Sequence, residues 1–284
     1  MMPLTTKKKK VLISVLSYAG YVLVACIFVL PMIYLFVSSF KTDMQIESDI
    51  SSIKAFLPTM HPTFDNFVKV FVRDHFHKFF LNSTVVACIY VTVAIVFNSM
   101  MGYALGMLEF KGRRFLISLM IAMSIIPAES VIINRFMVVY RLHMLNSYWG
   151  LALPMGGFPM FVFLYYNHFK GMPKELMEAA IMDGDNYNGI FWKIMLPLSK
   201  PIIATVAIMA FIGSWGDLLW PTLVTRDEQF RTLPLALQAL NSDIYIFWGQ
   251  ILTFSLLMTI PLLLVFLCFQ KQFIQSLAMT GIKG

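Results

Sequence analysis

The sequence has few charged residues, few cysteines and no phosphate-binding loop. Charged residues make up 13% of the 284 positions, whereas a soluble globular domain carries about 25%. This shortage excludes an ordinary soluble enzyme, and the apolar fraction of 58% excludes a disordered chain. The three cysteines lie far apart within apolar runs, so neither a disulfide framework nor a cysteine metal site is predicted. No G-x-x-x-x-G-K-[ST], H-E-x-x-H or G-x-S-x-G motif is present, which argues against a nucleotide hydrolase or an intramembrane enzyme.

Long apolar runs take the place of those features. A transmembrane helix needs about 20 mainly apolar residues, and six runs reach that length. We therefore predict an all-α integral membrane protein with six transmembrane helices in a single transmembrane domain, 1–284. The predicted spans are 12–37, 82–107, 115–140, 147–168, 202–222 and 249–269. They leave an outer loop at 38–81, a cytoplasmic loop at 169–201 and a cytoplasmic tail at 270–284.

The first apolar run resembles a lipoprotein signal, because Leu23-Val24-Ala25 precedes Cys26. A polar tether would be expected after a cleavage cysteine. Here the apolar run continues through Phe36 to full membrane thickness. A retained transmembrane helix is therefore the favoured interpretation.

The distribution of basic residues predicts the orientation of the spans. With the N-terminus inside, the inner segments hold 13 Lys and Arg residues and the outer segments hold eight. Lys and Arg near span ends mark the cytoplasmic side, so both termini are predicted to be cytoplasmic. The net charge of +7 is then a property of the inner surface, and it gives no reason to expect a nucleic-acid partner.

The cytoplasmic loop between the fourth and fifth predicted spans has the pattern of two short helices. Pro173 suits a first helical position. Glu175 and Glu178 place negative charge near a helix N-terminus, and Gly184 is a typical helix stop. The second helix is predicted to end at Pro197 and to bury one face, formed by Tyr187, Ile190, Phe191, Ile194 and Met195.

Small residues after Glu178 predict a surface on the first helix that another protein can approach closely.

The spacing of this loop resembles that of binding-protein-dependent ABC importer permeases, whose pattern is E-A-A, three residues, G, nine residues, I, any residue, L-P. The pattern is met by Glu178, Ala179, Ala180, Gly184, Ile194, Leu196 and Pro197. The flanking Gly171–Leu176 is similar to the carbohydrate-importer version of the loop, the MalG type.

The resemblance extends beyond the loop. Trp215–Pro221 is similar to the Trp-Asn-Asp segment of the family, with Gly216 in place of Asn, and Arg231-Thr-Leu-Pro234 follows it. The C-terminal tail is also similar, although Ser276 and Thr280 replace glycines of the family pattern. These replacements affect the expected fine contacts of the tail and leave the family assignment unchanged.

The resemblance implies a type I ABC importer permease that carries a sugar or oligosaccharide across a bacterial-type plasma (inner) membrane. Its implied partners are a second homologous permease, two cytoplasmic ATPase subunits and an extracytoplasmic solute-binding protein. The chain itself would be no enzyme and would hold no cofactor or metal, because ATP and Mg²⁺ would be bound by the ATPase subunits. The residues implied to contact the ATPase are Glu175, Glu178, Ala179, Ala180, Asp183, Gly184, Ile194, Leu196 and Pro197 in the loop, and Gln275, Gly281 and Lys283 in the tail.

Two alternatives stay open at this point. The same machinery carrying a phosphorylated polyol or another small solute is compatible with the loop, because the loop contacts the ATPase and carries no information on the cargo. A secondary transporter is the more distant alternative, since it would usually show internal repeats and more spans.

Charged residues inside apolar spans are costly and often functional. The predicted spans contain Glu129, Arg135 and Asp217. We consider two roles for them, lining the transport pathway or joining helices through polar contacts. The candidate pathway set is Glu129, Asn134, Arg135, Trp215 and Asp217. Sugar contact is also considered for Trp149, Trp215, Trp220, Tyr140 and Asn134, but Trp and Tyr gather at membrane interfaces, so interfacial anchors are the favoured interpretation. Gly102 and Gly106, spaced four apart, predict close helix packing.

Overall fold

The computed structural model describes the backbone of residues 6–241 and 245–281, and the side chains of residues 13–241 and 245–270. All regular elements in these ranges are helices and none is a strand, so the predicted all-α fold is confirmed. The chain divides into two compact units. One unit comprises residues 1–76 and 239–259, and the other comprises residues 77–238 and 260–284.

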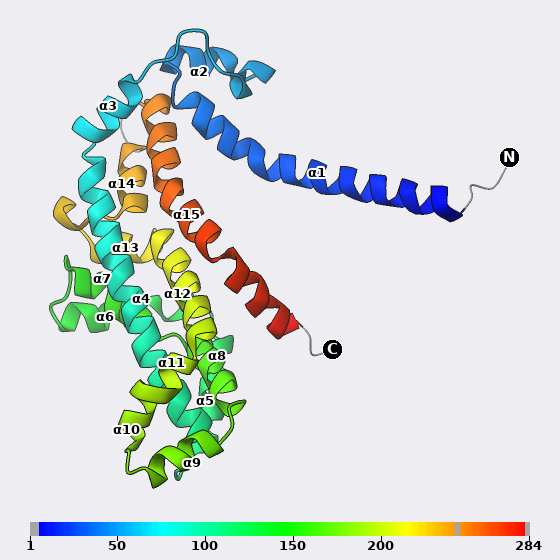
Figure 1. Ribbon diagram of the computed structural model, residues 1–284. Helices are drawn as coiled ribbons and strands as arrows, with labels where there is room; N and C mark the ends of the chain where they lie inside the picture. Colours follow the sequence, from blue (N-terminus) through cyan, green and yellow to red (C-terminus); the bar gives the residue numbers. More distant parts are fainter. Residues whose placement is uncertain (1–5, 242–244, 282–284) are drawn as a thin grey trace. The chain divides into compact units, whose positions relative to one another are not determined.

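Figure 1 labels the helices in chain order. Their bounds are α1 (Thr6–Ser38), α2 (Asp43–Asp49), η1 (Ile53–Phe56), α3 (Asp65–Val72), α4 (Phe76–Met107), α5 (Arg113–Ile125), η2 (Ala128–Val131), α6 (Ile132–Arg141), α7 (Tyr148–Gly156), α8 (Pro159–Lys170), α9 (Glu175–Met182), α10 (Tyr187–Ile190), η3 (Phe191–Met195), α11 (Leu196–Leu198), α12 (Lys200–Trp215), α13 (Leu219–Val224), η4 (Glu228–Phe230), α14 (Leu233–Leu240) and α15 (Trp248–Gly281).

Three helices are long and apolar enough to cross a membrane without a break. They are Ile13–Ser38 within α1, Phe76–Met107, and Trp248–Gln270 within α15. They contain or closely overlap the predicted spans 12–37, 82–107 and 249–269. Three further pairs of helices pass the same test only as bent pairs, so the described residues contain up to six spans if each pair counts as one.

The predicted span 115–140 differs from the structure, because the chain bends by 102° between α5 and the η2–α6 segment. Ile126 is extended, with φ −75° and ψ 122°, and Pro127 follows it. A proline disfavours the helical conformation of the residue before it and has no N–H to continue the hydrogen-bond ladder. One proline thus divides an apolar run that is long enough to be a single helix.

The other two differences have related local causes. The range 147–168 is divided at Gly157, and α7 and α8 meet at 49°. The range 202–222 is divided after Trp215, where Gly216 ends α12. Asp217 then accepts a hydrogen bond from the backbone N–H of Trp220 at 3.3 Å, in the first turn of α13. Both breaks therefore occur at or beside glycines.

The first unit is held together by a buried lysine. Lys41 is 1% exposed, and its Nζ donates to Asp49 Oδ2 at 3.0 Å and to the Lys54 carbonyl at 2.6 Å. The Asn66 amide donates to the carbonyls of Ser39 and Lys41 at 3.0 and 2.8 Å. Because a buried charge is stable only when it is paired, Lys41 fixes α2 and η1 beside the end of α1.

The second unit has its core between α4, α8 and α12. Gly102 and Gly106 of α4 lie directly against α8. A Cβ atom at Gly102 would lie 2.9 Å from the backbone carbon of Tyr165, and one at Gly106 would lie 2.9 Å from the Phe169 Cβ. The predicted close packing at these glycines is confirmed, and it places Tyr165 and Phe169 in the middle of the core.

Candidate functional site

Helix α9 carries the acidic residues of the loop 169–201, which is predicted to contact the ATPase subunits. It ends as predicted at Gly184, whose φ of +84° is in the left-handed region that glycine adopts most readily. The backbone N–H groups of Asp183, Gly184 and Asp185 each donate at 3.0 Å to carbonyls of the last turn of α9. The chain therefore reverses tightly into α10, and Glu175, Glu178, Ala179 and Asp183 stay exposed.

The two small residues of α9 have different environments. Ala179 is exposed, whereas Ala180 is buried in the core of the same unit. The expectation that both alanines form one open surface is wrong, because the helix uses Ala180 to pack against its own unit. Only Ala179, beside Glu178, is available to a close partner.

The second helix of the loop also differs from its prediction. Ile190, Phe191 and Met195 are buried, and Ile194 and Leu196 are half-buried, but Tyr187 is exposed. Residues Phe191–Met195 form a widened π-helical turn, and α11 continues through the exposed Pro197 to Leu198. The predicted end at Pro197 is wrong, since the widened turn accommodates a residue that lacks an N–H. The chain bends by 81° at Ser199 instead.

An ion pair closes the turn between α9 and the second helix. Lys193 Nζ donates to Asp185 Oδ2 at 3.0 Å, and Asp185 Oδ1 accepts from the Asn186 N–H at 3.1 Å. The hydrogen bond from Lys193 lowers the pKa of the Asp185 carboxyl below its usual range. Asn186 in turn caps α10 by accepting from the Gly189 N–H at 2.8 Å.

Aromatic contacts connect this loop to the core of the unit. The Tyr103 hydroxyl of α4 donates to the Tyr187 carbonyl at 3.2 Å. The Tyr103 ring lies 5.7 Å from that of Phe169 in α8 and 5.4 Å from that of Phe191 in η3, measured between centroids. A displacement of α9 and α10 would therefore act on α4 and α8 through rigid packing.

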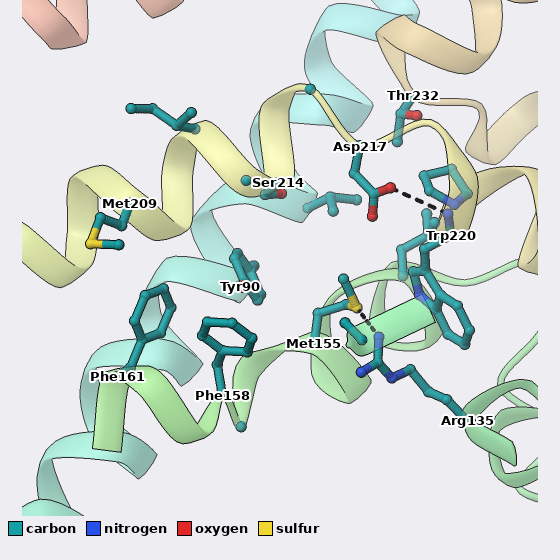
Figure 2. Close-up of a pocket in the computed structure, with 18 residues that line it drawn as sticks. Tyr90, Arg135, Met155, Phe158, Phe161, Met209, Ser214, Asp217, Trp220 and Thr232 are labelled. Carbon is teal, nitrogen blue, oxygen red and sulfur yellow. Dashed lines mark hydrogen bonds between the residues drawn. The ribbon is translucent and has the colours of Figure 1, made fainter. Parts of the chain in front are cut away.

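A cavity of about 490 Å³ lies elsewhere in the same unit, among α4, α6, α7, α8, α12 and α13 (Figure 2). Two of the candidate pathway residues, Arg135 and Asp217, line it. The Arg135 guanidinium donates to Met155 Sδ at 2.6 Å and lies 5.7 Å from the centroid of the Trp220 ring. The Trp220 indole is fixed by donating to the Gly150 carbonyl at 3.1 Å.

The cavity also contains a polar group without a protein partner. Thr232 is 3% exposed and lines the cavity, and its hydroxyl has no hydrogen-bond partner among the described residues. Figure 2 shows Thr232 near Asp217. Arg135 and Asp217 line the same cavity, so it offers charged hydrogen-bonding groups to a polar ligand. The aromatic side chains of Tyr90 and Trp220 add apolar faces.

The remaining pathway candidates lie away from the cavity lining. Glu129 is exposed in η2, and Asn134 is exposed on α6. Trp215 is buried and stacks on Phe211, with 5.1 Å between the ring centroids, so it is a packing residue. Conversely, the interpretation of Trp220 as an interfacial anchor is wrong, because it is 1% exposed and lines the cavity. The sequence held one signal for the position of Trp220. It follows Asp217 by three residues, a spacing typical of a helix start, where a side-chain oxygen accepts from a backbone N–H.

The predicted tail contacts are only partly described. Helix α15 continues through Gln275 to Gly281, whose side-chain environments are not among the described residues, and Lys283 lies outside the described residues altogether. Among the described residues, no group of three or more His, Cys, Asp and Glu side chains is placed to hold a metal ion.

Comparison with known proteins gives a consistent result. The family described as "Binding-protein-dependent transport system inner membrane component" matches residues 98–278. The arabinooligosaccharides transport system permease protein AraQ of Halalkalibacterium halodurans is 33% identical over 279 residues, which cover 98% of this chain and 99% of that protein. The trehalose/maltose transport system permease protein MalG of Thermococcus litoralis is 29% identical over 285 residues, with 98% and 99% covered.

A solved structure has the same fold. The crystal structure of a bacterial ABC transporter involved in the import of the acidic polysaccharide alginate contains a chain that matches with a TM-score of 0.81. The match covers 95% of this chain and 99% of that chain at 21% identity.

Proposed function

Because the chain belongs to the family of binding-protein-dependent transport system inner membrane components, we propose that it imports an oligosaccharide as a permease subunit of an ABC transporter. The cargo class is supported by two relatives, which are named as permease proteins of an arabinooligosaccharides and a trehalose/maltose transport system. The cavity lined by Arg135, Asp217 and the Trp220 ring supports this class as well, because charged groups and aromatic faces are of the kind that bind sugars.

The proposed assembly has this chain beside a second, homologous permease, with two ATPase subunits on the cytoplasmic side and a solute-binding protein on the outer side. ATP and Mg²⁺ belong to the ATPase subunits in this proposal, so the chain is not the enzyme. The excess of Lys and Arg in the inner segments supports cytoplasmic termini and a cytoplasmic α9.

The observation that carries the proposal is the construction of the α9–α10 loop. Its acids are exposed, while Ile190, Phe191 and Met195 of the segment that follows are buried. Tyr103 connects that segment to α4 and α8. A partner that moved α9 would therefore move membrane helices as well. ATPase closure would displace α9 and shift the spans between inward-open and outward-open arrangements. Glu178 is the proposed ionic contact to a basic residue of the ATPase.

Purification of the intact chain from its native membrane in mild detergent tests the assembly. We expect one second permease and two copies of a P-loop ATPase by mass spectrometry. Uptake of labelled oligosaccharides, with unlabelled oligosaccharides and a phosphorylated polyol as competitors, then tests the cargo. A chain isolated alone or as a homo-oligomer, with no ATPase, would contradict the assembly and reopen the secondary-transporter alternative.

A charge reversal tests the role of α9. We expect Glu178→Lys to lower uptake at least tenfold, because a charge-assisted hydrogen bond at a partly dry interface contributes about 1.5–3 kcal/mol. Membrane insertion should be unchanged, since Glu178 is exposed. Glu47→Lys is the matched control, because Glu47 is an exposed acid on the short helix α2. Normal uptake by Glu178→Lys would refute the contact.

A further inference from the structure

A second hollow in the same unit has a different character from the cavity at Arg135. It has a volume of about 460 Å³ and lies where α4 ends, α5 begins and α8 ends. Helices α5 and α8 pack against each other in this unit. The side chains that matter for its chemistry are Phe110, Arg113, Arg114, Ile117, Tyr166 and Lys170, and these six residues are called the basic notch below.

The basic notch presents three cations to one small volume. The same hollow is lined by one acid, Glu109, whose carboxylate forms an exposed ion pair with Lys174 at 3.2 Å. Lys170 Nζ lies 5.5 Å from the centroid of the Tyr166 ring, and Arg114 is exposed. Cations that line one hollow repel one another, and the binding of an anion between them would relieve that repulsion.

One of these cations is already fixed in place. Arg113 Nε donates to the Leu105 carbonyl at 2.8 Å, and its Nη2 donates to the Gly106 carbonyl at 2.9 Å. The guanidinium thereby caps the C-terminal turn of α4 and keeps its remaining N–H groups for another acceptor. Less side-chain entropy is lost on binding when a donor is preorganised in this way.

Helix α5, which contributes Arg113, Arg114 and Ile117 to the notch, also carries exposed apolar side chains. Phe115, Leu116 and Leu119 of α5 are exposed, and Phe115 is 69% exposed. Phe110 is also exposed at the rim of the notch. A ligand that joins a phosphate to long apolar chains would fill both surfaces at once, whereas a free phosphate would leave the apolar surface of α5 unused.

We propose that the basic notch binds the phosphate headgroup of an anionic phospholipid, whose acyl chains lie along α5. Basic pockets between transmembrane helices on the cytoplasmic side are suited to such headgroups. The orientation proposed above only determines which leaflet supplies the lipid. The site holds the end of α8, from which the chain runs through residues 171–174 into α9 (Figure 1).

Native mass spectrometry of the full-length protein, with the subunits that accompany it, tests this binding. Phosphatidylglycerol is added at increasing concentration, phosphatidylcholine with the same acyl chains is the neutral lipid, and glycerol phosphate is the free headgroup. The test variant is Arg114→Gln with Lys170→Gln, which leaves the structural Arg113 in place. The matched control is Lys111→Gln with Lys200→Gln, which removes the same charge from exposed positions outside the notch.

We expect the test variant to bind phosphatidylglycerol about 25-fold more weakly, or about fivefold for each charge removed. The control should bind within about twofold of the wild type. If the double variant does not fold, Arg114→Gln alone should lose about fivefold. Equal binding by wild type and variant, or equal binding of phosphatidylcholine, overturns the proposal. Binding of glycerol phosphate as tight as that of the lipid overturns it as well, because the site would then be one for free phosphate esters. Transport is not measured, so failure here is distinct from failure of the importer proposal.

Discussion

The contact between α4 and α8 at Gly102 gives a prediction whose sign can be worked out from the structure. In Gly102→Ala the new Cβ would lie 2.9 Å from both the Tyr165 backbone carbon and the Tyr166 backbone nitrogen. Carbon atoms pack at about 3.5–4.0 Å, so the two helices would have to separate by several tenths of an ångström. The obstacles are these backbone atoms and the Cβ of Tyr165, which is nearer still, and none of them can rotate away as the end of a side chain can.

The size of the effect follows from two opposing terms. Overpacking a close contact costs about 1–3 kcal/mol, whereas alanine improves helix stability over glycine by about 0.5–1 kcal/mol. We therefore expect Gly102→Ala to lower the free energy of unfolding by about 1–2 kcal/mol. At about 2–4 °C for each kcal/mol, the Tm should fall by about 2–8 °C.

Thermal unfolding of the purified protein in one detergent measures this change. Gly213→Ala is the matched control, because Gly213 lies within α12 and no described heavy atom outside its own helix turn is within 4 Å of its added Cβ. The control should keep or raise the Tm, since it gains helix stability without a clash. A Gly102→Ala protein as stable as the wild type would refute the argument from close packing.

Three further predictions concern the two candidate sites. Gly184→Pro should abolish ATPase coupling, because proline cannot adopt the φ of +84° found at this position. The control Gly171→Ala should retain coupled ATPase activity, because its added Cβ would lie 3.5 Å from the nearest atoms. Asp185→Asn should speed amide hydrogen exchange in the α9–α10 turn, because it removes the ion pair with Lys193. Since the pKa of Asp185 is lowered in the folded state, this ion pair is fully present above the unfolded-state pKa and is lost as the pH falls through the folded-state pKa. Exchange in wild type and variant should therefore become equal only in acid. Arg135→Met should raise the KM of uptake at least threefold without changing assembly, while Arg141→Met, at the exposed end of the same helix, should not.

The sequence predicted the helical class and the apolar segments because membrane thickness sets the length of each run. It did not predict where those runs break. Pro127 and Gly157 each occur inside a run whose average composition is apolar, and a long window averages over a single residue. The local geometry at these positions, with an extended residue in each case, decides the break. Local turn residues therefore determine details that composition leaves open.

The loop at α9 was predictable to a greater degree than the cavity. Gly184 and the acids before it are close in sequence, so short-range rules for helix ends describe them. The cavity combines Tyr90, Arg135 and Thr232 from elements far apart along the chain. No spacing rule relates residues at such separations, and the buried state of Trp220 depends on a hydrogen bond to Gly150 that lies 70 positions away.

The broken helices and the cavity are connected by the same physical requirement. Irregular backbone inside a membrane protein is tolerated where protein covers it or where it lines a water-filled space. Gly157 and Gly216, each at a break, line the cavity, as does Ala128 beside the break at Pro127. Arg135 and Asp217 line the same cavity, and Asp217 directly follows the break at Gly216. We therefore interpret these three breaks as the places where irregular backbone borders the cavity.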